Sequence, residues 1–158
     1  MIILFCGIPG SGKTTIAEVL AERLAALGRV KRLTSDRLKP PAYRRMFEAI
    51  EAGRGDEDFL ILDATFYKKE WRVRVAELAR GEPLITVYLN CPRGVALERN
   101  RERRQNISDR ALHIVYHRME PPDNPDLTID TSKTAPQEAV ELILRFVNRL
   151  YRLPEATR

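Results

Sequence analysis

Runs of apolar residues recur along the chain. The longest runs cover residues 2–6, 59–63 and 84–90. Apolar residues without polar alternation are typical of strands that are buried on both faces of a sheet. Two shorter segments, at 30–34 and 127–129, are candidates for further strands. The pattern therefore predicts five strands, most of them in the interior of the protein.

Between these runs, apolar residues recur at the spacing of a helix. They stand at every third or fourth position from Ile16 to Leu27, and again from Ala139 to Leu150. Gly28 is placed to end the first helix, because glycine readily adopts the conformation that follows a helix. Strands that alternate with helices indicate a parallel sheet. We therefore expect an α/β fold with three αβα layers, in which helices cover both faces of a five-stranded parallel sheet.

The length of the chain indicates the number of domains, and its net charge indicates a class of binding partner. The 158 residues are 44% hydrophobic and 31% charged, with a net charge of +5. This length suffices for one substantial core, so we expect a single domain over 1–158. The basic balance, with a pI near 9.5, favours anionic partners such as nucleotides or nucleic acids.

The sequence shows no sign of a membrane span, a targeting segment or a disulfide framework. The opening run MIILFC is far shorter than a membrane span and leads into Gly7 rather than into a cleavage site. Cys6 and Cys91 stand at the ends of apolar runs, where a thiol usually behaves as a small buried hydrophobe. We therefore expect a cytoplasmic protein without a membrane partner, a disulfide framework or a thiolate metal site.

Directly after the first predicted strand, residues 7–14 read GIPGSGKT, a complete match to the pattern G-x-x-x-x-G-K-[ST]. In such a loop, backbone N–H groups turn toward a phosphate, and the following helix adds its positive end. Lys13 is expected to reach the β- and γ-phosphates of ATP, and Thr14 to coordinate Mg²⁺. The alternative, a tight turn without a ligand, fits poorly with a complete match in this position. The expected ATP-binding residues are Gly7, Pro9, Gly10, Ser11, Gly12, Lys13, Thr14 and Thr15.

Two aspartates follow predicted strands, at the sheet edge where open α/β folds place their ligands. Asp63 ends an apolar run and is expected to hold Mg²⁺ together with Thr14, with a turn or cap role as the alternative. Asp36 is expected to act as catalytic base toward an acceptor hydroxyl, with a helix cap as the alternative. With the loop, these carboxylates predict the P-loop NTPase fold and phosphoryl-transfer chemistry.

Arginine outnumbers lysine 21 to 6 and is concentrated in two segments. Seven basic residues stand between 29 and 45 against one acid, so the acceptor side of the site should be positive. The segment 99–118 is expected to form an arginine-rich lid, in which Arg101 and Arg104 stabilise the transferring group. The alternative is a solvated helix face with i,i+4 ion pairs. The expected acceptor-binding residues are Asp36, Arg37, Arg44, Thr65 and Arg72.

Two further pairs of residues are spaced by one helical turn. Tyr67 and Trp71 stand among basic residues and could stack an acceptor base, but an ordinary packing contact is the favoured interpretation. His113 and His117 have no acidic or cysteine partner at ligand spacing, which favours a surface or core role over a metal site.

These motifs resemble the small P-loop kinases related to adenylylsulfate kinase, L-seryl-tRNA(Sec) kinase and polynucleotide kinase. GIPGSGKTT, SDR, LDATFYKKEWR and LNCPRGVALERNRER look like the L-seryl-tRNA kinase and polynucleotide kinase pattern. MEPPDNPDLTIDT looks like the closing segment of that group and of adenylylsulfate kinase. The resemblance implies that Lys13 and Thr14 hold ATP and Mg²⁺, that Asp36 contacts the acceptor hydroxyl, and that lid arginines stand at 101–104.

Departures from these families leave the acceptor open. Adenylylsulfate kinases usually carry Asp-Gly-Asp where this chain has Thr34-Ser35-Asp36, and Ser-Pro where it has Thr65-Phe66. L-seryl-tRNA kinases carry a further C-terminal domain that grips the tRNA. We therefore expect an ATP-dependent kinase that acts on a hydroxyl of a small nucleotide-like acceptor, with an RNA or tRNA kinase as the alternative. A regulatory ATPase without a hydroxyl acceptor is the alternative of another class.

Overall fold

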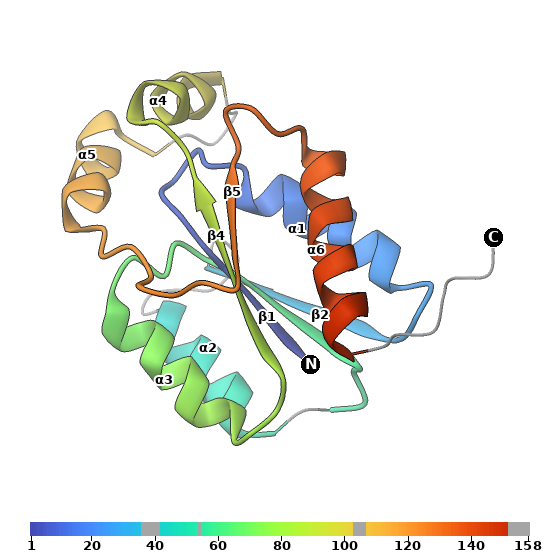
Figure 1. Cartoon of the computed structure of the whole chain (residues 1–158). Coiled ribbons are helices and arrows are strands. Elements are labelled where there is room, and N and C mark those ends of the chain that lie inside the picture. Colours follow the sequence, from blue (N-terminus) through green and yellow to red (C-terminus); the bar gives the residue numbers. More distant parts are fainter. Residues whose placement is uncertain (36–41, 54, 103–106, 152–158) are drawn as a thin grey trace.

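Five parallel strands form the centre of the computed structural model, which describes residues 1–35, 42–53, 55–102 and 107–151 (Figure 1). The strands are β1 (Ile2–Cys6), β2 (Val30–Thr34), β3 (Phe59–Asp63), β4 (Leu84–Asn90) and β5 (Leu127–Asp130). They lie in the order β2-β3-β1-β4-β5, and each neighbouring pair is parallel. The five predicted strands are confirmed, and β5 is one residue longer than expected.

Helices cover both faces of this sheet. They are α1 (Lys13–Leu24), α2 (Ala42–Glu51), α3 (Lys69–Ala79), α4 (Arg93–Glu102), α5 (Asp109–Arg118) and α6 (Pro136–Tyr151). α1 and α6 pack on one face, and α2 and α3 pack on the other (Figure 1). The predicted arrangement of three αβα layers is therefore confirmed. Among the described helices, none is long and apolar enough to cross a membrane.

The central strand β1 contributes to both halves of the core. Ile3 and Phe5 pack with α1 and α6, whereas Ile2 and Leu4 pack with α2 and α3. Every residue of β1 is buried, as is every residue of its neighbour β3. Burial on two faces explains why these strands are continuously apolar in the sequence.

β4 departs from the continuous burial that its apolar run predicts. Alternate residues of β4 are buried against α1 and α6, whereas on the opposite face Leu84, Thr86 and Tyr88 are only half-buried and Asn90 is exposed. A hollow therefore remains beside Tyr88, near the carboxyl end of the strand. α4 and α5 lie beyond that end of β4, in the region where the lid is expected (Figure 1).

Candidate active site

The loop between β1 and α1 leads directly into a helix start that has no side-chain cap. Gly12 precedes α1 with a φ of 89°, a left-handed conformation that side chains rarely adopt. No side chain hydrogen-bonds to the first turn from this capping position. The first N–H groups of a helix point outward along its axis and carry its positive end. This geometry suits an anionic ligand such as a phosphate.

Gly10 joins the same loop to α4. Its φ is +83°, and a Cβ at this position would collide with the carbonyl of Ala96. Ala96 is fully buried in α4, so the loop and that helix touch through their backbones. Glycine is therefore required here both for its conformation and for the space that it leaves.

Lys13 folds back over the loop that precedes it. Its Nζ donates to the carbonyl of Gly7 at 2.9 Å and to that of Ile8 at 2.8 Å, and it lies 3.4 Å from Ser11 Oγ. Only 8% of the residue is exposed. The ammonium group is thus held at the centre of the loop, in position to meet the β- and γ-phosphates of a nucleotide.

Asp63 lies at the carboxyl end of β3, beside the start of the loop. It is in register with Phe5 of β1 and with Thr34 of β2, and only 2% of it is exposed. Thr14 is half-buried in the first turn of α1. A carboxylate and a hydroxyl are hard oxygen ligands, and Mg²⁺ commonly uses one or two such groups with phosphates and waters. The donor set therefore fits Mg²⁺. Within the described ranges, no three His, Cys, Asp or Glu side chains lie close enough together to hold a metal ion by themselves.

The turn after β3 is fastened to the loop and to α2. The Gly7 N–H donates to the Thr65 carbonyl at 3.1 Å. Phe66 has a φ of 41°, which is strained for a residue with a side chain, and it is fully buried. The Tyr43 hydroxyl accepts from the Phe66 N–H at 3.0 Å and lies 2.7 Å from Thr65 Oγ1. Burial raises the pKa of Tyr43 to about 12, so its hydroxyl keeps its proton.

Arg72 holds the other side of this turn. Its Nη1 donates to the Phe66 carbonyl at 2.6 Å, and the Cys6 thiol also points to that oxygen at 3.5 Å. Burial raises the pKa of Cys6 to about 11, despite the nearby guanidinium. Thr65 and Arg72, both predicted to bind the acceptor, are therefore engaged in holding the Phe66 turn in this structure.

Trp71 packs among aromatic side chains. Its ring stacks on Tyr43 at 3.8 Å between centroids and meets Tyr67 edge to face at 4.8 Å. Lys68 Nζ lies 5.2 Å from the same ring. These contacts join α2 to α3 and agree with the packing interpretation of the Tyr67 and Trp71 pair.

The helices α4 and α5, in the region where the lid is expected, are tied to the body of the protein and to each other. Arg99 Nη2 donates to the Thr131 carbonyl, just after β5, at 2.6 Å. Asn100, with 1% of its surface exposed, donates from Nδ2 to the Ile107 carbonyl at 2.7 Å and accepts from the Ile107 N–H at 3.2 Å. Arg101, predicted to be catalytic, forms an exposed ion pair with Asp109 at 2.7 Å. The contacts of Asn100 and Arg101 therefore link α4 to the first residue of α5 and to the segment just before it.

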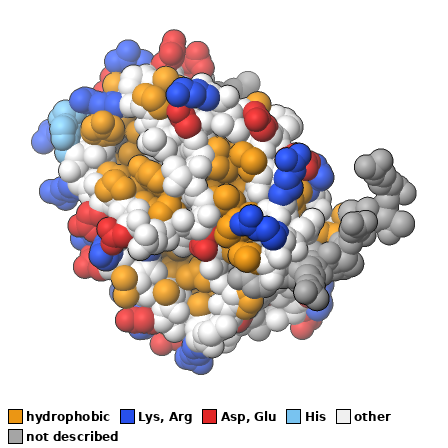
Figure 2. All heavy atoms as spheres, viewed as in Figure 1, with side chains coloured by type: hydrophobic (Ala, Val, Ile, Leu, Met, Phe, Trp, Pro, Cys, Tyr) orange, Lys and Arg blue, Asp and Glu red, His pale blue; other side chains and the backbone are white. Residues whose placement is uncertain are grey.

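The two histidines lie on α5 next to a basic side chain, at the edge of the face seen in Figure 2. Arg93 Nη2 donates to His113 Nδ1 at 2.5 Å, and the rings of His113 and His117 are 4.2 Å apart. Loss of hydration lowers the pKa of His113, with further contributions from Arg93 and His117. Arg93 also lies over the Tyr116 ring, 5.5 Å from its centroid. The contacts agree with a surface role for this pair.

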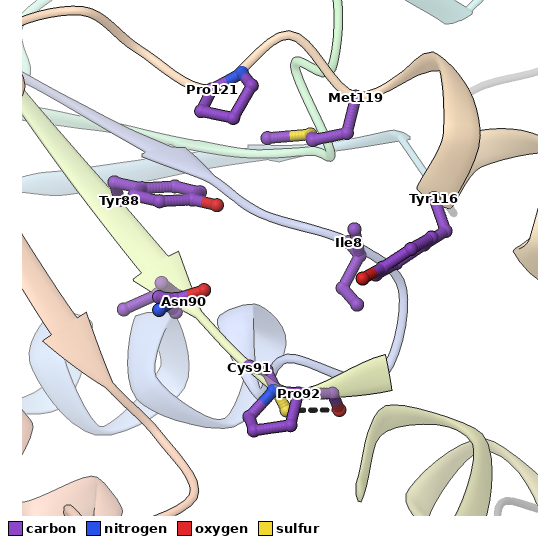
Figure 3. Close-up of a pocket in the computed structure, with 9 residues that line it drawn as sticks. Ile8, Tyr88, Asn90, Cys91, Pro92, Tyr116, Met119 and Pro121 are labelled. Atoms are coloured by element: carbon purple, nitrogen blue, oxygen red, sulfur yellow. Dashed lines mark hydrogen bonds between the residues drawn. The ribbon is translucent and has the colours of Figure 1, made fainter. Parts of the chain in front are cut away.

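A cavity of about 380 Å³ lies beside the loop, and the sequence patterns did not point to it. Ile8 is the loop residue in its wall; the other residues shown there come from β4, α5 and the segments that follow these elements (Figure 3). The lining residues are Ile8, Tyr88, Leu89, Asn90, Cys91, Pro92, Tyr116, Met119 and Pro121. The one available signal was the position of Tyr88 and Asn90 at the carboxyl end of a strand, where ligands gather in α/β sheets.

Several predicted site residues stand apart from this assembly. Arg44 lies on the exposed face of α2, where its Nε is 3.4 Å from Glu48 Oε1. Asp36, Arg37 and Arg104 lie outside the described residues. The structure thus brings together the loop, Asp63 and the Thr65 turn, and the roles of all the predicted site residues stay predictions.

Comparisons with known proteins agree with this geometry. The chain is 25% identical to the L-seryl-tRNA(Sec) kinase of Methanococcus maripaludis, over 84% of this chain and 60% of that protein. It is 28% identical to the probable adenylyl-sulfate kinase of Pyrococcus abyssi, over 96% of this chain and 97% of that protein. The structure of the Mycobacterium tuberculosis APS kinase CysC, in complex with AMPPNP and APS, superposes with a TM-score of 0.72 at 16% identity, covering 93% of this chain and 96% of the other.

A family model supplies the assignment. The model described as AAA domain, AAA_33, matches residues 2–122, which include the loop, Asp63, the Thr65 turn, α4 and α5. The resemblance to small P-loop kinases that the motifs indicate is thereby confirmed. The chain belongs to the AAA domain family AAA_33.

Proposed function

We propose that the protein is an ATP-dependent kinase that transfers the γ-phosphoryl group of ATP to a hydroxyl of a small nucleotide-like acceptor. The observation that carries this proposal is the position of Lys13, whose Nζ is held by the carbonyls of Gly7 and Ile8 in front of an uncapped helix start. In this position the ammonium group would contact the β- and γ-phosphates of ATP and stabilise the γ-phosphoryl group as it is transferred.

The residues around the loop have complementary roles. Thr14 and Asp63 would hold Mg²⁺, which, when bound, neutralises charge on the β- and γ-phosphates. Lys13 and the N–H groups of the loop orient the phosphate chain and stabilise the charge that develops on it. Arg101 and Arg104 are proposed to add positive charge from the lid, which requires that Arg101 leave its ion pair with Asp109.

Asp36 is proposed as the catalytic base, one residue beyond the last described residue after β2. The acceptor oxygen forms a bond to the γ-phosphorus while the bond to the leaving ADP oxygen breaks. The acceptor proton passes to the Asp36 carboxylate. Arg37 and Arg44 are proposed to attract the acceptor's negative charge, because the basic segment that contains them follows the same strand.

The relatives support a nucleotide-like acceptor or an RNA. One is named as an adenylyl-sulfate kinase and is matched over 97% of its length, which favours the small acceptor. The other is named as an L-seryl-tRNA(Sec) kinase and is matched over 60% of its length, so RNA is the second candidate.

The test is transfer of label from γ-labelled ATP to a panel that contains adenylylsulfate, tRNA, 5′-hydroxyl RNA and small alcohols. We expect label on adenylylsulfate or another nucleotide, and loss of at least about 100-fold in Lys13→Ala. Asp36→Ala should lose about 100-fold or more in transfer while it still binds AMPPNP. Label found only in free phosphate would contradict the proposal and favour an ATPase.

A further inference from the structure

The cavity beside the loop is built from segments that are far apart in the sequence. Tyr88 and Asn90 reach it from β4, Tyr116 from α5, and Met119 and Pro121 from the segment after α5 (Figure 3). Its volume of about 380 Å³ is within the range of small-molecule sites in proteins. The cavity is therefore large enough for the body of an acceptor and not only for water.

The chemistry of the wall is aromatic and neutral. Among the described residues that line it, no side chain is charged. Both phenolic oxygens, from Tyr88 and Tyr116, point into the space between the two rings (Figure 3). Burial raises the pKa of Tyr88, and the nearby Cys6 and Tyr116 raise it further, so its phenol stays protonated. The wall thus offers apolar surface and neutral hydrogen-bonding groups.

One wall residue connects the cavity to the phosphate-binding lysine. The side chain of Ile8 lines the cavity, while its carbonyl accepts from Lys13 Nζ at 2.8 Å. A compound in the cavity therefore lies next to the group that is proposed to hold the γ-phosphate. This is the place for an acceptor, since its hydroxyl must come into line with that phosphate.

The two tyrosines are held by their neighbours. Arg93 lies over the Tyr116 ring at 5.5 Å, and His117 meets the same ring edge to face at 5.6 Å. Tyr88 is half-buried in β4, where its backbone is in register with Cys6. Supported aromatic side chains lose little entropy when a planar ring binds against them.

We propose that this cavity binds a nucleobase of the acceptor, with the planar ring against Tyr88 and Tyr116 and its polar edge toward the phenol hydroxyls and Asn90. The proposal rests on the proposed function, because it treats the cavity as the acceptor side of the kinase site. An aromatic wall binds any base by stacking, whereas a sugar acid would bring a carboxylate into a wall whose described residues carry no cation.

The base can come from a free nucleotide or from the terminal nucleotide of an RNA, which present the same ring. The test is calorimetric titration of the full chain, saturated with AMPPNP and Mg²⁺ so that its ATP site is occupied. The probes are adenosine 5′-monophosphate, a short RNA that ends in adenosine, and gluconate. We expect one or both adenosine probes to bind and gluconate not to bind; the tighter adenosine probe identifies the source of the base.

Variants then connect the binding to the two rings. Tyr116→Leu and Tyr88→Leu should each weaken the adenosine probe about tenfold, because stacking on the ring is lost. Tyr116→Phe keeps the ring and should retain most of the affinity. Ile114→Ala is the matched control on α5, since Ile114 is 41% exposed, close to the 40% of Tyr116, and does not line the cavity. Since Tyr116 is on the surface, its variant should fold even if Tyr88→Leu does not.

Two results would overturn the assignment: binding of the adenosine probes that is unchanged in both leucine variants, or binding of gluconate without the adenosine probes. Transfer assays with labelled ATP distinguish failure of the base site from failure of the kinase proposal. Label on gluconate, with unchanged rates in the leucine variants, would keep the kinase and remove the base site. Ring-dependent binding of adenosine without transfer to any acceptor would keep the base site and remove the kinase.

Discussion

The phenolic oxygen of Tyr43 lies 2.7 Å from Oγ1 of Thr65, and it also accepts a hydrogen bond from the next backbone N–H at 3.0 Å. Through this one atom, α2 holds the strained turn that follows β3. In the same turn, the Thr65 carbonyl accepts a hydrogen bond from the N–H of Gly7, the first glycine of the phosphate-binding loop. α2, the turn and the loop therefore form one connected unit.

Tyr43→Phe should lower the free energy of unfolding by about 1–3 kcal/mol, because the N–H of Phe66 is left without this partner in the interior. The aromatic stack on Trp71 is kept, so the loss isolates the hydroxyl. Chemical denaturation measures it. Tyr116→Phe is the control, since a half-exposed phenol bonds to water in either state, and a change below about 0.5 kcal/mol is expected. Equal effects of the two variants would contradict the role of Tyr43.

Gly10→Ala should destabilise the protein more than Gly81→Ala does. Both glycines have positive φ, +83° and +85°, and a new side chain in this conformation costs about 1–2 kcal/mol. A Cβ at Gly81 meets open space, whereas a Cβ at Gly10 collides with the Ala96 carbonyl of α4. The difference in unfolding free energy between the two variants measures this backbone contact. Gly10→Ala should also weaken AMPPNP binding; identical stability and binding in both would contradict the contact.

Asn100→Ala should loosen the connection between α4 and α5. Its carboxamide makes two hydrogen bonds to the backbone of Ile107, and both groups of Ile107 lose a partner in the variant. We expect a loss of about 1–3 kcal/mol in unfolding free energy and a lower transfer rate. Asn148 on the exposed side of α6 provides the control, where alanine should change stability by less than about 0.5 kcal/mol. A stable Asn100→Ala variant with a normal rate would show that this link is dispensable.

Acidification should weaken the contact between Arg93 and His113. The pKa of His113 is lowered in the folded protein from its ordinary 6.5, so the unfolded chain binds the proton more readily. The stability that comes from the neutral ring is complete above pH 6.5 and is lost as the pH falls through the lower folded pKa. Arg93 and the neighbouring His117 face the ring, and both disfavour its positive charge.

His113→Gln is the informative variant, because its amide oxygen still accepts from Arg93 but does not titrate in this range. Between pH 7.5 and 5.5, the melting temperature of the wild-type protein should fall further than that of the variant. Parallel curves for the two proteins would show that another group controls the acid sensitivity.

Residues close together in the chain allowed much of the fold to be predicted. The five strands, the loop at 7–14 and the helix that starts at Lys13 all follow from apolar runs and glycine spacing. The packing interpretation of Trp71 and the surface role of the histidines also agree with the contacts that the structure describes. The position of Asp63 beside the loop follows from its place at the end of a buried strand.

The sequence by itself thus determined the phosphate-binding half of the site, because the strand, loop and helix that form it are contiguous in the chain. Only the tertiary structure decided that Arg72 and Thr65 hold the turn at Phe66, and that Ile8 and Tyr116, over 100 residues apart in the sequence, share a cavity. Contacts of this kind depend on how helices cross the carboxyl edge of the sheet. Packing between distant segments leaves no periodic pattern in the sequence, and so the cavity that we propose for the acceptor became visible only in three dimensions.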